Sequence, residues 1–365
     1  MTINAYAEKR DLRLYEAEFS PEAISQRFGI SEKNILDFSL NINPIGPSPM
    51  CQRAAKDELA FGGKYPDIHL KLIRQQVSLR HNVAEGMIAF GAGLDEVIKL
   101  ITQAWSRTGE KAVLHIPTFP RYELECKLHG LEVISVSSDK PWNVNMDKFT
   151  AACQTHQPAL AFICTPNNPT GTVIQTDDIA TLVRNFPDTI FIVDEALINP
   201  LESGSIELAK QYTNVAILRT FSKYYGLAGY RIGYLIACDD LIQSLEIARP
   251  PFNVSAIAAA AACAAMADST HLAQVKEEIA REAEFFVSEI RKLEKYIVRG
   301  CYSNMTLLEL TTMTSEQLCT GLAIEGFIVA DGKSFKGLED FETVRISIKD
   351  HSSNMALLAA LKKQL

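Results

Sequence analysis

The sequence has few aromatic residues, and its cysteines and histidines are not spaced as metal ligands. Aromatic residues make up 8% of the chain, and its eight cysteines are scattered without a CxxC pair. That pattern is typical of reduced thiols in a cytoplasm and not of a zinc cage. The seven histidines show no HxxH or HExxH spacing, so we expect no metal site in this protein.

The chain also lacks an excess of positive charge and a long apolar run. A net charge of −8 argues against a nucleic-acid or anionic-membrane partner. The N-terminus has no apolar signal core, and the longest apolar stretch, residues 254–267, is too short to span a bilayer. It predicts a buried, alanine-rich helix. We therefore expect a cytoplasmic protein with neither a nucleic-acid nor a membrane partner.

Apolar runs alternate with helix-length segments between residues 87 and 237. This alternation predicts an α/β fold with a mostly parallel sheet that helices cover on both faces. The chain has 365 residues, 47% hydrophobic and 22% charged, which is typical of a globular protein with a large and a small domain. Seven runs are strand candidates: MIAF (87–90), AVLHI (112–116), EVISV (132–136), ALAFIC (159–164), IFIVD (190–194), VAILRT (215–220) and IGYLIA (232–237).

The pattern changes after about residue 265. Residues 270–296 predict one long amphipathic helix with acid–base pairs along it. After it, helix candidates alternate with the short strand candidates YIVRG (296–300), MTLLEL (305–310), FIVAD (327–331) and VRISI (344–348). We predict an N-terminal arm at 1–40 that packs with the small domain, a large domain at 41–264 and a small α/β domain at 265–365. The other helix candidates are SPEAISQRFGI (20–30), CQRAAKDELA (51–60), HLKLIRQQVSLRH (69–81), SEQLCTGLAIEG (315–326) and HSSNMALLAALKKQL (351–365).

One stretch, TFSKYYGLAGYRIGY at 220–234, follows a predicted buried strand and contains Lys223. A lysine at the end of a buried strand is costly unless it is neutralised or used. A Schiff base with an aldehyde cofactor uses it. Thr220, Ser222 and Arg231 are the hydroxyl and guanidinium donors that suit a phosphate. Together these residues indicate pyridoxal phosphate (PLP), and the alternative is a surface lysine in a glycine-containing turn.

Three more stretches supply groups that PLP requires. In CTPNNPTG (164–171), Asn168 follows a predicted strand and could bind the ring's phenolic oxygen, unless this is an ordinary Asn-Pro turn. In IFIVDEA (190–196), Asp194 ends a buried strand and would keep the pyridine nitrogen protonated, or would cap a helix. The glycines of GAGLDEVI (91–98) let backbone N–H groups approach a phosphate, although the dinucleotide fingerprint is absent.

The order of these motifs, from the glycine-rich turn through NNPTG, Asp-Glu-Ala and Ser-Lys to the arginine, resembles the fold-type-I aminotransferases of class I and II. The resemblance covers nearly the whole chain. DFSLNINPIGPSP (37–49), YPD (65–67) and PTFPRY (117–122) are similar to the branch of histidinol-phosphate aminotransferase and threonine-phosphate decarboxylase. The resemblance implies PLP fold type I, PLP as cofactor, a homodimer, and a small amino acid or amino-acid-like substrate.

The resemblance also implies roles for residues around the cofactor. Lys223 would form the Schiff base, Asp194 would pair with the pyridine nitrogen and Asn168 would contact the ring oxygen. Phe119 would stack on the ring, and Tyr65 would reach the cofactor phosphate of the partner subunit. The phosphate of the chain's own site would be surrounded by Ala92, Gly93, Thr220, Ser222 and Arg231.

The substrate side of the site departs from the family pattern. Arg345, in TVRISI, would hold the substrate carboxylate, with Asn41 as a neutral donor nearby. Histidinol-phosphate aminotransferase and threonine-phosphate decarboxylase both carry an arginine at the position matched to Ala330. The substrate pocket of this chain should therefore be less cationic. We expect a substrate with an uncharged or weakly polar side chain, or a distal anion held by Lys333 or Lys336.

Two reactions are consistent with this resemblance, because the family branch includes both aminotransferases and decarboxylases. The leading expectation is an aminotransferase, and the alternative is an amino-acid decarboxylase. The chain lacks the decarboxylase's His-Gly-Gly stretch before DFSLN, has Leu197 where the aminotransferase has a tyrosine, and has Ala92 in place of a commoner asparagine. A non-catalytic PLP-binding protein is disfavoured because Lys223, Asp194 and Arg345 are all present.

Overall fold

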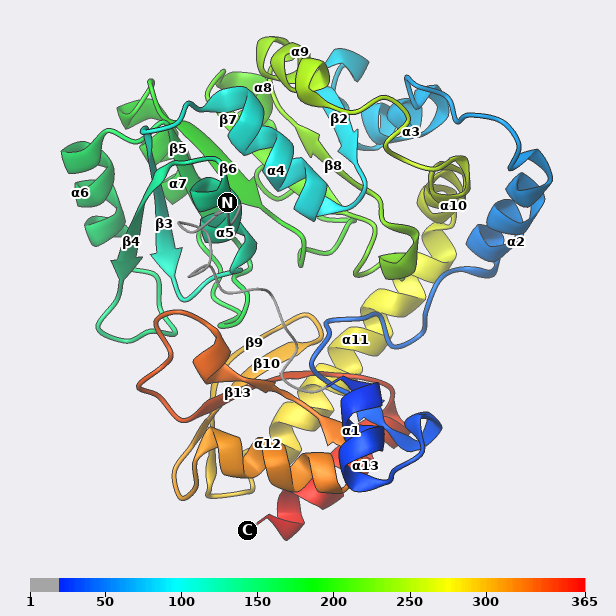
Figure 1. The fold of residues 1–365 in the computed structure, drawn as a ribbon, viewed down its shortest axis with the longest axis vertical. Coiled ribbons are helices and arrows are strands. Elements are labelled where there is room, and N and C mark those ends of the chain that lie inside the picture. The colour runs from blue at the N-terminus through cyan, green and yellow to red at the C-terminus, as the bar shows by residue number, and fades with distance from the viewer. Residues whose placement is uncertain (1–19, 365) are drawn as a thin grey trace, which may run out of the picture.

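The computed structural model describes residues 20–364, so part of the predicted N-terminal arm lies outside the described residues. Figure 1 shows a large sheet with its helices in one part of the molecule and a smaller sheet in another. Helix α11 (Ser269–Ile290) runs from the first part to the second. This arrangement confirms the predicted α/β fold, whereas the domain boundaries at residues 40 and 264 stay a prediction.

The large sheet has seven strands in the order β2-β8-β7-β6-β5-β3-β4. Strand β8 runs antiparallel to its neighbours β2 and β7, and the other pairs are parallel. Each strand falls on a predicted apolar run, because strands covered on both faces need continuous apolar sequence. Their bounds are β2 (Ile88–Gly91), β3 (Lys111–Ile116), β4 (Glu132–Ser137), β5 (Leu160–Cys164), β6 (Ile190–Asp194), β7 (Val215–Thr220) and β8 (Gly233–Ile236).

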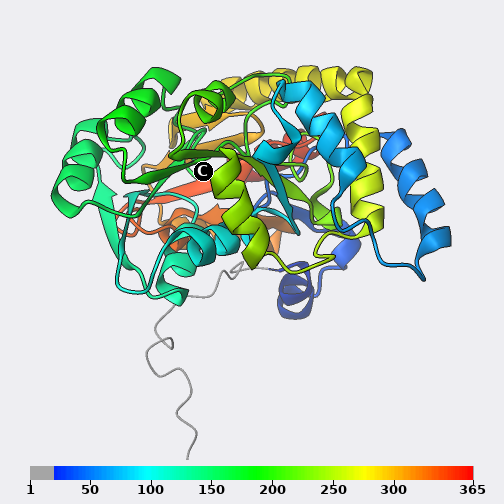
Figure 2. The ribbon, with the colours of Figure 1, turned by 90° about the horizontal axis from the view of Figure 1, so that it is seen from above.

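Helices pack against both faces of the large sheet, as Figure 2 shows from above. One apolar core lies beneath α3 (Lys71–His81), α6 (Met146–His156), α7 (Thr176–Asn185), α8 (Ile206–Gln211) and α10 (Ala256–Ala267). The other lies beneath α4 (Leu94–Trp105), α5 (Arg121–Leu128) and α9 (Asp239–Ala248). Helix α2 (Pro49–Glu58) packs on α10. The loops at the strand ends therefore start from a sheet that is covered on both faces.

The smaller sheet is antiparallel, with the order β12-β13-β10-β9. Its strands are β9 (Tyr296–Tyr302), β10 (Met305–Leu310), β12 (Ala330–Asp331) and β13 (Thr343–Ser347), and its helices are α12 (Ser315–Ile324) and α13 (His351–Lys363). From the N-terminal segment, α1 (Pro21–Phe28) packs on α12, and β1 (Leu36–Asp37) pairs in parallel with β11 (Phe327–Ile328). Short 3-10 helices lie at Glu32–Asn34, Leu59–Phe61, Glu85–Met87, Ala228–Tyr230 and Gly332–Ser334.

Helix α11 is shorter than the predicted span of 270–296. It ends at Ile290, and Tyr296 instead begins β9, where it pairs with Leu310. The Tyr296 hydroxyl also donates a hydrogen bond to the carbonyl of Leu361, at 3.1 Å. The prediction of a helix through residue 296 was wrong at its end, because residues 291–295 form turns, whereas the predicted strand YIVRG is confirmed by β9.

The alanine-rich stretch forms α10, whose buried face includes Ala258, Ala261 and Ala262. This confirms the predicted buried helix. Within residues 20–364, no single helix is long and apolar enough to cross a membrane. Helices α10 and α11 are long and apolar enough only when taken together, and they are bent by 79° relative to each other.

Candidate active site

The candidate site lies where β5, β6 and β7 end. These strands are parallel neighbours, and their pairing places Cys164 beside Asp194 and Asp194 beside Leu218. The loops that follow carry Asn168 and Lys223. Ligands of open α/β sheets bind at this carboxyl edge, because the loops there converge from several strands. The fold therefore gathers motifs that are far apart in the sequence.

Lys223 lies in the loop that follows β7. The residue keeps some exposure, whereas its amine is enclosed by protein. Burial, reinforced by the positive charges of Arg345 and Arg231, lowers the pKa of Lys223 to about 8, against the opposing effect of Asp194 and Asp95. A buried amine with a pKa near neutrality is a usable nucleophile and proton carrier.

Asp194 is buried, and both of its carboxylate oxygens accept hydrogen bonds. The Tyr122 hydroxyl donates to Oδ2 at 2.6 Å, and the Ala196 backbone N–H donates to Oδ1 at 2.9 Å. Burial raises the pKa of Asp194 to about 6, while these two donors act in the opposite direction. The hydrogen bond from Ala196 lies in a turn, and residues 195–200 form no helix, so the alternative that Asp194 caps a helix is wrong. Sequence reasoning missed Tyr122, although it lies in the same PTFPRY stretch as Phe119, whose ring it meets edge-on at 5.6 Å.

The glycine-rich turn lies between β2 and α4, next to Arg231. Gly93 has φ +84°, and a Cβ there would collide with the Arg231 guanidinium. The missing side chain thus lets a cation lie against the turn. Arg231 also donates to Asp95 Oδ2 at 3.1 Å, and the Ala92 N–H donates to Glu96 Oε2 at 2.6 Å.

The hydroxyls after β7 lie in the same stretch as Arg231. Thr220 Oγ1 accepts a hydrogen bond from the Ser222 N–H at 3.1 Å, and both residues are partly exposed. Hydroxyls, a guanidinium and a turn with no side chain at Gly93 form a donor set that suits a phosphate group. The residues therefore fit the phosphate end of PLP.

Arg345 and Asn168 connect the two parts of the molecule. Arg345 is buried on β13, and its Nη1 donates to Asn168 Oδ1 at 2.6 Å. Its Nη2 donates to the carbonyl of Ser39, and its guanidinium lies 5.3 Å from the centre of the Phe335 ring. The structure thus brings together the predicted carboxylate-binding arginine and the predicted ring-binding asparagine.

The neighbouring Asn167 was not predicted, yet it fixes the loop that carries Asn168. Its Oδ1 accepts from Thr118 Oγ1 at 2.8 Å and faces His115 Nε2 at 3.2 Å. Its Nδ2 donates to the Pro117 carbonyl and to Thr170 Oγ1, both at 2.9 Å. This buried amide joins the loop of Phe119 to that of Asn168. The NNPTG motif contains it, but only the tertiary contacts show its partners.

Tyr65 and Asn41, two further predicted site residues, differ in their surroundings, because Tyr65 is exposed and Asn41 is buried. Tyr65 is 82% exposed, and its ring stacks on Phe252 at 4.7 Å. Asn41 is buried; its Nδ2 donates to the Met305 sulfur at 3.2 Å, and its Oδ1 accepts from Ser347 Oγ at 2.7 Å. Tyr65 is thus a surface residue of this chain, while Asn41 packs against the small sheet.

The residues expected to govern the distal pocket can now be placed. Ala330 pairs directly with Arg345 across β12 and β13. It packs on a small apolar cluster that includes Leu307, Phe335 and Leu338. Both candidate lysines have carboxylate partners: Lys333 donates to Glu342 at 2.6 Å, and Lys336 donates to Glu123 at 2.8 Å and to Ser135 at 2.9 Å.

The model of the family "Aminotransferase class I and II" matches residues 33–361. The chain belongs to this family. It is 32% identical to a histidinol-phosphate aminotransferase of Caldicellulosiruptor saccharolyticus, over 91% of this chain and 92% of the relative. The protein is therefore an aminotransferase with PLP as its cofactor, acting on an amino acid or amino-acid-like substrate.

Solved structures show the same fold. A histidinol-phosphate aminotransferase from Sinorhizobium meliloti, in complex with pyridoxal-5'-phosphate, is similar with a TM-score of 0.88 and 23% identity, covering 100% of this chain and 98% of that one. An L-threonine-O-3-phosphate decarboxylase from Porphyromonas gingivalis has a TM-score of 0.80 and 25% identity, covering 90% and 99%. The predicted PLP fold type I and its branch are thereby confirmed.

Proposed function

We propose that Lys223 attaches PLP covalently and carries the proton in transamination. The observation that supports this most is the enclosed amine just after β7, because burial lowers the pKa of Lys223 to about 8, and the positive charges of Arg345 and Arg231 add to that effect. An ordinary lysine would be almost entirely protonated at neutral pH and unable to attack an aldehyde. The position after β7, at the carboxyl edge of the sheet, is where ligands bind in this type of fold.

The other site residues have roles that follow from their contacts. Asp194, held in place by Tyr122, pairs with the pyridine nitrogen. Asn168 uses its Nδ2 for the ring oxygen while its Oδ1 accepts from Arg345, and Phe119 stacks on the ring. Thr220, Ser222, Arg231 and the Ala92–Gly93 turn hold the phosphate. PLP itself supplies an electron sink for the α-carbon of the bound amino acid.

Arg345 selects the reaction by orienting the substrate carboxylate. A guanidinium fork holds a carboxylate in one plane through two parallel hydrogen bonds. With the carboxylate held there, Lys223 would be the group that moves the proton of the α-carbon, and PLP would supply the electron sink. Decarboxylation would require a different orientation of the carboxylate. Asn41, which accepts a hydrogen bond from Ser347 on the same strand β13 as Arg345, serves as a neutral donor toward the substrate.

The distal side of the substrate is uncharged in this proposal. Ala330 offers neither charge nor donor, and Lys333 and Lys336 are engaged by Glu342 and Glu123. The adjacent cluster of Leu307, Phe335 and Leu338 makes that side apolar. We therefore expect phosphothreonine and histidinol phosphate to be poor substrates. A large preference in kcat/KM for phosphorylated compounds, retained after both lysines are changed to Ala, would contradict this expectation.

The protein acts as a homodimer in which Tyr65 reaches the cofactor phosphate of the partner subunit. Supporting this, Tyr65 and its stacking partner Phe252 are exposed, and so are Leu59, Phe61 and Leu72 in the elements before and after the Tyr65 loop; a second copy would cover such apolar side chains. All eight cysteines are free thiols, which fits a cytoplasmic location.

The test uses the purified protein with PLP and borohydride, which fixes the cofactor to its lysine. The peptide that contains Lys223 should carry the label, and Lys223→Ala should lose both the label and turnover, whereas Lys276→Ala, on the exposed face of α11, should lose neither. A screen of amino acids then identifies the donor from the keto acid formed. Label at another lysine would refute the proposal, and release of carbon dioxide with an amine would identify a decarboxylase.

A further inference from the structure

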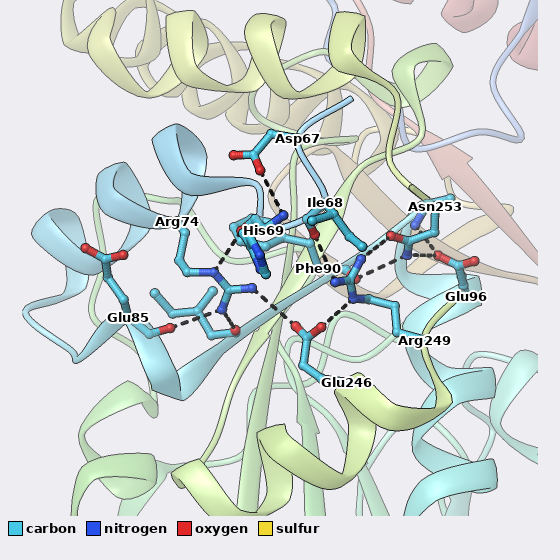
Figure 3. Close-up of polar contacts among 12 residues, drawn as sticks. Asp67, Ile68, His69, Arg74, Glu85, Phe90, Glu96, Glu246, Arg249 and Asn253 are labelled. Atoms are coloured by element: carbon cyan, nitrogen blue, oxygen red, sulfur yellow. Dashed lines mark hydrogen bonds and ion pairs between the residues drawn. The ribbon is translucent and has the colours of Figure 1, made fainter. Parts of the chain in front are cut away.

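Figure 3 shows a polar network beside residues 67–69, which follow Tyr65 in the chain. Its centre is Glu246 on α9, whose two carboxylate oxygens bind two arginines. Arg249 Nε donates to Oε2 at 2.6 Å, and Arg74 Nη2 donates to Oε1 at 3.2 Å. The Arg249 side chain is only 7% exposed. Charges this deeply buried are kept paired, so their geometry is fixed.

Both arginines also hold the backbone just after Tyr65. Arg249 Nη2 donates to the Ile68 carbonyl at 3.1 Å, and Arg74 Nε donates to the His69 carbonyl at 3.2 Å. Residues 62–70 contain no helix or strand. The position of this segment therefore depends on the side chains of Arg74 on α3 and Arg249 just after α9, and on Asp67, which accepts from the His69 and Lys71 N–H groups.

The same arginine fixes the surface on which the Tyr65 ring rests. Arg249 Nη1 donates to Asn253 Oδ1 at 2.8 Å, and the intervening Phe252 stacks on Tyr65. Phe252 has φ +59°, a left-handed conformation that is unfavourable for a phenylalanine unless its surroundings enforce it. Contacts on either side of Phe252 supply that enforcement. Arg249 thus fixes both the segment after Tyr65 and the ring against which Tyr65 stacks.

We propose that Arg249 is a positioning residue that holds Tyr65 in the place from which it serves the partner subunit's cofactor. This inference rests on the proposed composite site. A neutral or unbranched side chain cannot donate to Glu246, Asn253 and Ile68 at once, because only a guanidinium presents several N–H groups in a fixed fork. Its loss should release the Tyr65 segment without removing any group that touches the cofactor.

The experiment compares PLP dissociation constants, from the absorbance of bound cofactor, for Tyr65→Phe, Arg249→Gln and the double variant. Loss of a hydrogen bond to a charged group weakens binding by roughly ten- to a hundredfold, so we expect that size for Tyr65→Phe and up to that size for Arg249→Gln. The double variant should bind no more weakly than the weaker single variant, because both changes remove one interaction. Additive effects would overturn the inference.

Mixed dimers distinguish an effect on the partner from an effect within the chain. Arg249→Gln chains are combined with Lys223→Ala chains. In the mixed dimer, one site takes its Lys223 from the Arg249→Gln chain and its Tyr65 from the Lys223→Ala chain, in which Arg249 is intact. Covalent cofactor uptake at that site should show the native affinity. Continued weak uptake would place the effect in the same chain, along the contacts from Asn253 to Glu96 Oε2 at 2.6 Å, and would overturn the inference.

Two further variants control for folding. Arg249→Lys keeps a charge beside Glu246 but cannot bridge to Asn253 and Ile68 together, so a folded protein with weakened PLP binding is expected. Arg281→Gln removes an arginine that is 65% exposed on α11, and it should leave PLP affinity unchanged. If both Arg249 variants bind PLP with native affinity while Tyr65→Phe binds it more weakly, the role of Arg249 is rejected and the composite site stands. Native affinity in Tyr65→Phe would reject the composite site and this inference with it.

Discussion

The lowered pKa of Lys223 predicts how fast the cofactor-free enzyme takes up PLP at each pH. Only the neutral amine attacks an aldehyde. With a pKa of about 8, roughly one amine in eleven is neutral at pH 7, against about one in three thousand at the ordinary value of 10.5. At equal intrinsic reactivity, Lys223 should therefore react about 300-fold faster at pH 7 than an ordinary lysine.

The sign of the effect fixes the shape of the profile. Because the neutral form predominates above the pKa, the rate of covalent uptake should rise with pH up to about 8 and then level off. Stopped-flow absorbance with excess PLP measures this rate from pH 6 to 11. A free lysine derivative with a blocked α-amine serves as the control, and its rate should keep rising to about pH 10.

Two variants should move the inflection in opposite directions. Arg345→Met removes a positive charge that lowers the pKa of Lys223, so its inflection should move to higher pH. Asp194→Asn removes a negative charge that raises this pKa, so its inflection should move to lower pH. A wild-type inflection near pH 10, or shifts of both variants in one direction, would refute the described environment of the amine.

Three further variants test the rest of the site. Asp194→Ala should slow α-proton loss in single-turnover experiments far more than it weakens PLP binding, and an unchanged rate would exclude the electron-sink role. Tyr122→Phe removes a buried donor to Asp194, so it should raise the pKa of that carboxyl further and cost about 1–3 kcal/mol in the free energy of unfolding measured in urea at pH 7.5; full native stability would contradict the hydrogen bond. Arg345→Lys should lose about one to two powers of ten in kcat/KM, because an ammonium cannot form the planar fork, and a loss of stability with unchanged kcat/KM would indicate a structural arginine.

The sequence by itself determined the large sheet and the nature of the chemistry. All seven strands of that sheet fall on predicted apolar runs, since strands covered by helices on both faces carry their burial in their own composition. The motifs around Asn168, Asp194 and Lys223 each directly follow such a strand. Parallel strands end at one edge, so their convergence could be predicted without coordinates.

Only the tertiary structure decided the contacts between residues far apart in the chain. Local periodicity extended α11 to residue 296, but the helix ends at Ile290, before Tyr296 begins β9 and pairs with Leu310. No sequence pattern shows that Tyr122 supports Asp194 or that Arg249 holds the segment after Tyr65. Such hydrogen bonds depend on the distance and direction between side chains brought together by folding, and neither quantity is encoded in local spacing.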